Sequence, residues 1–228
     1  RILDVAPKRT IEACDEVLDC LSEKQKEKIQ AVSMDMWQAF ESSVEANLPN
    51  ARIVHDPFHI AKYLNEAVDK VRRAENKELV SEGDDRLKGS KHTLLFNPEN
   101  LTDARNEQLS KILQASVKTS RAWQLKEWFR YFWEEDDAVG GRRFFRDWYS
   151  RAIRSRLDPV KKVARMLKSR LDRIVTWFAN RISNGRAEGF NSRIQSLKSA
   201  ARGFRKFQHY RTRILFFCGK LDLKPQIL

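Results

Sequence analysis

The chain has 228 residues, of which 41% are hydrophobic and 33% charged, and its formal net charge is +13 at pH 7. This composition is typical of a folded protein with one sizeable core, and it excludes a disordered chain. No apolar run reaches the ~18–20 residues that span a bilayer, so the positive charge indicates nucleic acid rather than a membrane as the partner.

The first 60 residues alternate between strand-like and helix-like patterns. In chain order, we expect a strand over residues 1–5, a helix over 11–21, a strand over 29–34, a helix over about 37–47 and a strand over 52–55. Thr10 is the expected N-cap of the first helix. Because the connections are short, this order predicts a parallel sheet. Ligands of such sheets lie beyond the carboxyl ends of the strands, where Asp35 and Asp56 are found.

After residue 60 the pattern becomes helical. The spacing of apolar residues predicts a helix over residues 60–73, followed by a polar break over 81–85. Residues 121–149 contain ten of the 23 aromatic residues, which predicts the core of a helical bundle; stacking on nucleic-acid bases is the alternative. The acidic run and two glycines within 134–141 predict a solvated loop, and residues 159–178 predict a basic amphipathic helix.

The most basic part of the chain surrounds a single glutamate, Glu188. Residues 142–213 contain 21 lysines and arginines against four acidic residues, a net charge of +17. Glu188 is expected in the first turns of a helix that Ser183 or Asn184 caps and Gly203 closes. This helix has one apolar stripe, formed by Phe190, Ile194, Leu197, Ala201 and Phe204. The cations expected to contact phosphates are Arg186, Arg193, Arg202, Arg205 and Lys206.

Three acidic residues have positions that suit phosphodiester chemistry, because this chemistry needs carboxylates that hold two hard cations. Spacing alone leaves ordinary interpretations open. Asp35 can be a plain strand-end acid, Glu188 a helix-start acid favoured by the macrodipole, and Asp56 the start of an Asp-Pro turn. His59 can take part in a site or simply cap or pair with Asp56.

Four segments carry a resemblance to a known family. They are residues 32–37 (Val-Ser-Met-Asp-Met-Trp), residues 48–59 with Asp-Pro-Phe-His at their end, residues 65–72 (Asn-Glu-Ala-Val-Asp-Lys-Val-Arg) and residues 183–205 with Gly-Arg-Ala-Glu-Gly-Phe-Asn at their centre. Together they resemble the transposases of bacterial insertion sequences in the DDE superfamily, in particular the group called the "ISL three" type. The resemblance covers essentially the whole chain.

This resemblance implies an α/β fold: a ribonuclease H-like domain, incomplete at its N-terminus, with a large all-helical insertion. The implied domains are the first part of the catalytic domain over 1–75, the helical insertion over 76–178, and a C-terminal catalytic helix and tail over 179–228. By motif, Asp35 matches the family's second aspartate and Glu188 its glutamate, which implies that both bind Mg²⁺, or alternatively Mn²⁺. Asp56 and His59 match the accessory (Cys/Asp)-x-x-His motif of related transposases.

One of the family's ligands is not matched. Because only one strand precedes the first helix, the first aspartate is expected upstream of Arg1, as are the zinc-binding and helix-turn-helix parts of the family. The implied function is a transposase catalytic domain that cleaves and transfers DNA strands, although these residues alone are expected to leave DNA uncut. The alternative is a catalytically inactive DNA-binding remnant of such a transposase. An RNA-binding helical protein would fit the charge but not the strand-end carboxylates.

The implied partner is DNA, both the transposon ends and the target. The resemblance also allows a homo-oligomer on DNA and implies no membrane. Cys14, Cys20 and Cys218 lack C-x-x-C spacing, which predicts reduced core cysteines in a cytosolic protein. The expected location is therefore the bacterial cytoplasm, in association with the nucleoid.

Overall fold

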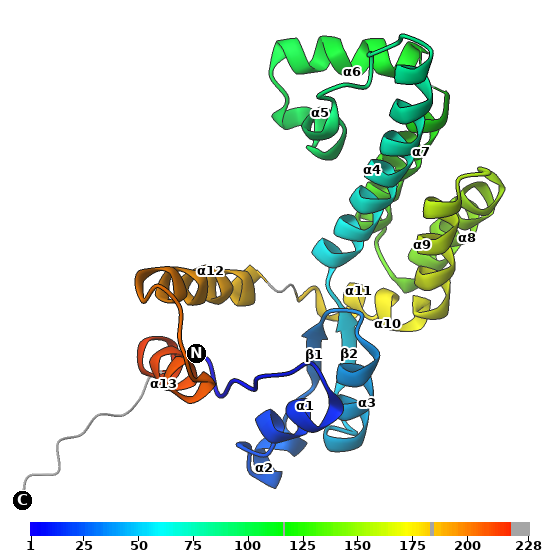
Figure 1. Ribbon diagram of the computed structural model, residues 1–228. Helices are drawn as coiled ribbons and strands as arrows, with labels where there is room; N and C mark the ends of the chain where they lie inside the picture. The colour runs from blue at the N-terminus through cyan, green and yellow to red at the C-terminus, as the bar shows by residue number, and fades with distance from the viewer. Residues whose placement is uncertain (116, 183–184, 220–228) are drawn as a thin grey trace, which may run out of the picture. The chain divides into compact units, whose positions relative to one another are not determined.

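The chain forms two compact units (Figure 1). The computed structural model describes residues 1–115, 117–182 and 185–219. One unit, called the sheet unit here, comprises Arg1–Asp56 together with Ile182–Leu228. The other, called the helical unit, is the continuous segment Pro57–Arg181. The functional boundaries expected from the sequence, after residues 75 and 178, differ from this division and stay a prediction.

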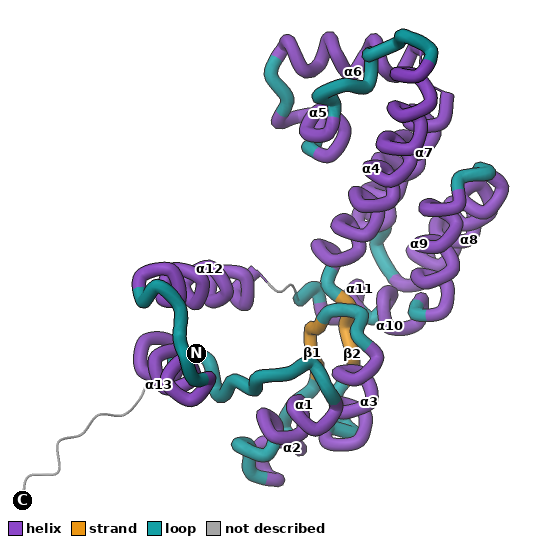
Figure 2. Tube along the Cα trace, viewed as in Figure 1, coloured by secondary structure: helices purple, strands orange, loops and turns teal. Residues whose placement is uncertain are grey.

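The sheet unit contains a small parallel sheet. Its elements are α1 (Ile11–Leu18), α2 (Glu23–Glu27), β1 (Ala31–Met34), α3 (Gln38–Asn47), β2 (Arg52–His55), α12 (Gly185–Ala200) and α13 (Phe207–Cys218). β1 and β2 are the parallel pair, with Ala31 opposite Arg52 and Met34 opposite His55 (Figure 2). Since parallel strands need a crossover connection, α3 supplies it. The predicted strand–helix–strand order over residues 29–55 is confirmed.

The core of the sheet unit lies between this strand pair and α3. Met34, Val44, Leu48 and Ile53 are buried there, with exposed fractions of 7% or less. Partly buried residues from α1 and the loops cover this core. Thr10 caps α1 as expected, because its Oγ1 accepts the Ala13 N–H at 3.3 Å.

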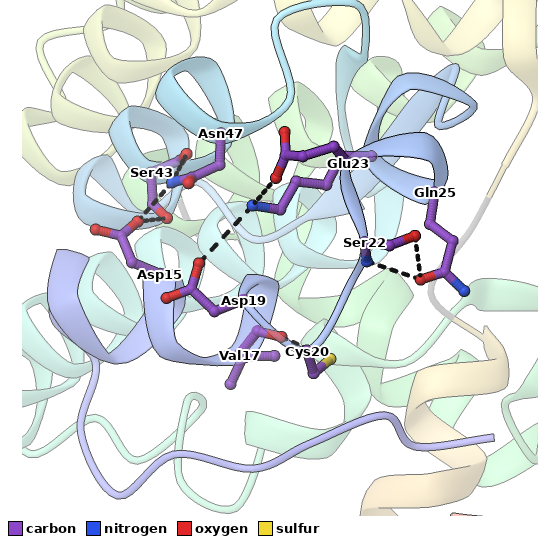
Figure 3. A network of polar contacts seen from close by, with 10 residues as sticks. Asp15, Val17, Asp19, Cys20, Ser22, Glu23, Gln25, Ser43 and Asn47 are labelled. Carbon is purple, nitrogen blue, oxygen red and sulfur yellow. Dashed lines mark hydrogen bonds and ion pairs between the residues drawn. The ribbon is translucent and has the colours of Figure 1, made fainter.

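Polar contacts fasten α1 and α2 to their neighbours (Figure 3). The Asp15 carboxylate on α1 accepts hydrogen bonds from Ser43 Oγ and from Asn47 Nδ2, the latter at 2.8 Å, and both partners lie on α3. Lys26 Nζ lies 3.1 Å from Glu23 Oε1 and 3.8 Å from Asp19 Oδ1. The α1–α3 contact is therefore held by a charge-assisted hydrogen-bond network as well as by apolar packing.

The strand expected over residues 1–5 is wrong. These residues have extended backbone but are not part of the sheet. Instead, the Ile2 N–H donates to the carbonyl of Cys218 at 2.9 Å, and Asp4 forms a bidentate ion pair with Arg211 of α13 at 2.6 Å. The hydrogen bonds from Arg211 lower the pKa of the Asp4 carboxyl below its usual value. An apolar extended segment becomes a strand only where another strand is available to pair with it. Residues 1–5 contact the helix α13 instead, so they are not part of the sheet.

The helical unit is all-helical in its described part. Its elements are α4 (Pro57–Ser81), α5 (Lys91–Leu95), the 3-10 turn η1 (Pro98–Asn100), α6 (Asp103–Ala115), α7 (Val117–Arg130), the 3-10 turn η2 (Tyr131–Glu134), α8 (Ala138–Arg154), α9 (Asp158–Ser169), α10 (Leu171–Val175) and α11 (Trp177–Asn180). α4 packs against α5, α7 and α9 (Figure 1). It extends beyond the predicted range of 60–73 in both directions. Its earlier start agrees with Pro57, because proline is favourable in the first turn of a helix.

Aromatic rings form the core of the helical unit. Phe129, Phe132, Phe145 and Trp148 are each 3% exposed or less. The rings of Phe129 and Phe132 are stacked with centroids 5.1 Å apart, and Trp148 meets Phe129 edge-on at 4.8 Å. The prediction of a bundle core is therefore confirmed for these residues.

Two predictions in this unit are wrong because packing overrides the local pattern. Gly140 and Gly141 lie inside α8 rather than in a loop, since Asp137 caps this helix and Gly141 lies against the Phe178 ring. A Cβ atom at position 141 would be 2.5 Å from Phe178 Cε2. The single helix expected over 159–178 is broken at Arg170, where the chain turns so that α10 and α11 bury Ile174 and Phe178.

Two further features are the apolar character of the helices and the exposure of the cysteines. Within the described ranges, none of the helices combines the length and apolar character needed to cross a membrane. The three cysteines are free thiols, but Cys20 is exposed, so the expectation of three core cysteines is wrong at that position.

Candidate functional site

The carboxyl ends of β1 and β2 bring two of the predicted acids to one edge of the sheet. Asp35 and Asp56 directly follow the paired residues Met34 and His55. The Asp56 N–H donates to the Met34 carbonyl at 3.4 Å, which extends the pairing by one residue. The positions that the sequence pattern gave to these two acids are confirmed.

Asp35 is held by a cation that the sequence did not indicate. Its Oδ2 atom lies 3.3 Å from Arg9 Nη2, and its Oδ1 atom accepts the Met36 N–H at 2.8 Å. The guanidinium of Arg9 lies 4.8 Å from the centroid of the Trp37 ring, whose Nε1 donates to the Arg9 carbonyl at 2.9 Å. The Asp35 side chain is 22% exposed, so it is oriented by these contacts and still reached by solvent.

A buried polar pair lies next to Asp56. His55 Nε2 is 3.6 Å from Glu41 Oε1, and the two side chains are 0% and 1% exposed. Asp56 is itself 2% exposed. This pair connects α3 to the end of β2, and no spacing rule links residues 41 and 55 in the sequence. The pair therefore fixes the backbone that carries Asp56.

His59 lies in the first turn of α4, on the helical unit. It is partly buried, and its ring meets the Phe58 ring edge-on with centroids 5.8 Å apart. Asp56 ends the sheet unit and His59 belongs to the next unit along the chain. Their accessory role at a catalytic site stays a prediction.

Glu188 lies in the first turn of α12, as expected. Ser183 and Asn184, the expected caps, lie outside the described residues. Within the described part of the chain, the Oε1 atom of Glu188 is buried and accepts no hydrogen bond. Burial of a carboxylate oxygen without a donor is unfavourable unless a cation or another donor reaches it.

The donor set suits a hard divalent cation, because carboxylate oxygens are the ligands that Mg²⁺ and Mn²⁺ prefer. Asp35 offers a partly exposed carboxylate and Glu188 a buried oxygen. Among the described residues, no three His, Cys, Asp or Glu side chains form a group that could hold a metal. The approach of Asp35 to Glu188 therefore stays a prediction.

The predicted phosphate contacts lie on and after α12. Arg193, Arg202, Arg205 and Lys206 are all exposed, whereas the side chain of Arg186 lies outside the described part. The helix ends near Gly203, as expected, with a φ of +92° there and a bond from its N–H to the Lys198 carbonyl at 2.9 Å.

The apolar stripe of α12 is only partly buried. Phe190, Ile194, Leu197 and Phe204 are half-buried, and Ala201 is exposed, so the expectation is wrong at that residue. α13 is a packing partner of α12, and the rings of Phe204 and Tyr210 lie 4.9 Å apart. The helix is therefore supported along one side, which leaves its basic side chains in solvent.

Comparisons with known proteins agree with the resemblance noted above. A family model with the description "Transposase" matches residues 1–214. The transposase for insertion sequence element IS1001 of Bordetella parapertussis is 28% identical over 213 residues, which cover 92% of this chain and 52% of that protein. The transposase for element IS1557 of Mycobacterium tuberculosis is 27% identical, covering 83% of this chain and 48% of its own length. The chain thus spans about half the length of the curated relatives it matches. No solved structure matches.

Proposed function

Because the chain belongs to the "ISL three" type family of insertion-sequence transposases in the DDE superfamily, we propose that it is part of a catalytic domain that cleaves DNA strands and transfers them during transposition. The family match covers nearly the whole chain. A ribonuclease H-like arrangement of the catalytic domain is part of this proposal. The parallel β1–β2 pair with acids at its carboxyl edge supports it.

We assign the metal ligands to Asp35 and Glu188, with Mg²⁺ as the ion and Mn²⁺ as an alternative. Such ions, when bound, stabilise charge on the attacking and leaving oxygens of a phosphodiester. The observation that carries the assignment is the buried Glu188 oxygen that accepts no hydrogen bond within the described residues, in a segment of net charge +17. Arg9 orients Asp35 by its contact with the Asp35 Oδ2 atom. A metal ion that bound this oxygen would have to share it with Arg9 or displace Arg9.

In the same proposal, other residues of this chain bind the DNA substrate. The exposed cations Arg193, Arg202, Arg205 and Lys206 can contact phosphates without reading the base sequence. Asp56 and His59 are proposed to line the site rather than to bind metal. The DNA ends of the element, the target DNA and an assembly of several copies on DNA are proposed partners of the whole protein.

In this proposal Asp35 and Glu188 are two of the three carboxylates that the family resemblance implies. Each carboxylate contributes a ligand and a negative charge that keeps two dications together. We therefore expect weak Mg²⁺ binding and no cleavage of supercoiled DNA by the 228 residues alone. Titration with Mn²⁺ and a plasmid-nicking assay measure both quantities.

The decisive test uses a longer protein that includes the upstream family residues. Glu188→Gln and Asp35→Asn should each abolish metal-dependent nicking at element ends, because each removes a metal ligand without adding bulk. Glu23→Gln, which changes an 83% exposed carboxylate on α2, is the matched control and should keep activity. Cleavage that survives both Asp35→Asn and Glu188→Gln would show that the site lies elsewhere.

DNA binding is the second readout of the same test, and it should be nearly unchanged in both site variants. Roughly 6–10 phosphate contacts would weaken binding ~10³–10⁵-fold between about 50 and 200 mM salt. A flat salt response would contradict the assignment of the basic segment. Normal DNA binding without nicking in the longer protein would favour the inactive remnant.

A further inference from the structure

The helical unit has its own concentration of positive charge, apart from α12. Residues 142–173 contain 12 lysines and arginines against three acids. Each acid already has a partner: Asp147 pairs with Arg146 at 3.1 Å, Asp158 with Lys161 at 3.0 Å, and Asp172 with Arg142 at 2.7 Å. The remaining excess of cations is therefore not neutralised by these three acids.

The excess charge lies on the outer faces of α8 and α9. α8 buries Gly141, Phe145, Trp148 and Ala152, and α9 buries Val160, Ala164 and Leu167. Helical periodicity then places the remaining side chains on the solvent side. The exposed cations of the two helices and their turn that form no ion pair with a carboxylate in the described part of the chain are Arg143, Arg151, Arg154, Arg156, Lys162, Arg165 and Lys168. The two helices pack against each other as a hairpin (Figure 1).

Arg156, in the turn between these helices, has an unusual backbone. Its φ is +60°, in the left-handed region that a residue with a Cβ atom seldom adopts and that glycine adopts freely. The three non-glycine residues with positive φ in the described ranges are all arginines: Arg156, Arg181 and Arg202.

The side chains of the two such arginines in the helical unit differ in what they contact, while the Arg156 backbone lies in a turn where the Leu157 N–H donates to Ser155 Oγ at 3.3 Å. Arg181 Nη2 donates to the Asp136 carbonyl at 3.4 Å, and its guanidinium lies 5.3 Å from the centroid of the Trp177 ring. The Arg156 side chain is exposed and makes no hydrogen bond or ion pair with the described residues. A strained backbone with an unused cation at a turn suggests that the side chain acts on a partner.

A cavity beside this turn adds further anion-binding groups. It has a volume of about 280 Å³ and is lined by Arg121, Gln124, Leu125, Trp128, Arg151 and Ser155. The Arg151 guanidinium is held 4.6 Å from the centroid of the Trp128 ring, and Ser155 directly precedes Arg156. Arginine held in this way is favourable for phosphate recognition.

We propose that the α8–α9 turn is a contact site for the phosphate backbone of DNA, with Arg156 at its tip. This proposal rests on the proposed function, which makes DNA the substrate, and it adds a second contact surface on the helical unit. The site is sequence-independent, because phosphate contacts fix the position of a protein on the duplex without reading bases.

The test is Arg156→Gly in the 228-residue chain. The probe is a short duplex of random sequence, measured by fluorescence anisotropy over a series of salt concentrations. Glycine relieves the backbone strain, so the urea midpoint of unfolding should rise while DNA affinity falls several-fold. The slope of log affinity against log salt should decrease in magnitude by about 0.9, the value for one lost phosphate contact. Arg156→Lys keeps the charge and should keep the slope.

Arg86→Gln is the matched control. It removes one positive charge from the same unit, but Arg86 already pairs with Asp84 and donates to the Ala115 carbonyl at 3.3 Å, so the slope should not change. Unchanged affinity and slope in Arg156→Gly would overturn the site, and a lower urea midpoint would overturn the strain argument. If the unaltered chain failed to bind the duplex, the proposed function would fail with it; normal binding by the unaltered chain confines the failure to this site.

Discussion

Glu75 on α4 closes the N-terminal end of α7, and replacing it provides a sharp test of how the helical unit is held together. Its side chain is buried, with 7% of the residue exposed, and its carboxylate accepts the N–H groups of Lys118 at 3.1 Å and of Thr119 at 2.6 Å. The first N–H groups of a helix have no partner within that helix, and the macrodipole favours a negative charge beside them. Glu75 thus satisfies two donors and the dipole at once.

The magnitude follows from these contacts. A hydrogen bond to a charged group contributes about 1.5–3 kcal/mol, and glutamine keeps one acceptor while its amide group faces the second N–H. Glu75→Gln should therefore lower the free energy of unfolding by about 2–3 kcal/mol. For a chain of this size, that corresponds to a decrease in Tm of roughly 4–12 °C.

Glu78→Gln is the matched control, one turn along the same helix. Glu78 pairs with the Lys118 ammonium, but its side chain is 58% exposed, so about 0–1 kcal/mol is expected. Urea unfolding followed by tryptophan fluorescence suits the measurement, because five of the six tryptophans lie in the helical unit: Trp123, Trp128, Trp133, Trp148 and Trp177. Equal urea midpoints for the two variants would refute the capping role of Glu75.

Three further predictions concern the stability of the two units. Arg211 lowers the folded-state pKa of Asp4, so their pair stabilises the fold above the unfolded pKa and is lost as the pH falls through the folded one. The difference in unfolding free energy between the unaltered chain and Asp4→Asn should be constant near neutral pH and should shrink toward zero as the pH falls below 3.8. A difference that does not depend on pH would contradict this linkage. Gly141→Ala should destabilise the helical unit by about 1–2 kcal/mol, because overpacking against Phe178 exceeds the gain in helix propensity. Gly189→Ala, whose Cβ meets nothing within 4 Å, should instead stabilise by about 0.5–1 kcal/mol in the same urea assay.

Local patterns were sufficient to predict the elements around Asp35 and Asp56. Both residues follow apolar segments whose pairing partners are close in sequence, so the alternation of strand and helix determines where they lie. Glu188 was placed correctly in a first helical turn for the same reason, since capping residues and glycines mark the ends of helices. The metal site that would unite Asp35 with Glu188 goes beyond these local signals and stays a prediction.

Contacts between distant residues were not predictable from the sequence. Nothing in the pattern links Arg9 with Asp35, or Asp4 with Arg211, because a single charge pair leaves no periodic signal. The prediction of a strand over residues 1–5 was wrong for this reason: the position of this segment depends on its contacts with α13, which is distant in sequence. The helix expected over 159–178 was broken by packing, which overrides local propensity.

The sheet unit is built from two segments that precede and follow the helical unit along the chain, and this order has a consequence for synthesis on the ribosome. β1 and β2 leave the ribosome early, whereas α13, which holds Asp4 through Arg211, is translated after residue 181. Domains generally fold as units during synthesis, so the helical unit can form its aromatic core before the sheet unit is complete. A nascent chain would therefore form the basic α8–α9 hairpin before Glu188 had been added, and premature termination would yield the proposed phosphate-contact site without the proposed catalytic glutamate.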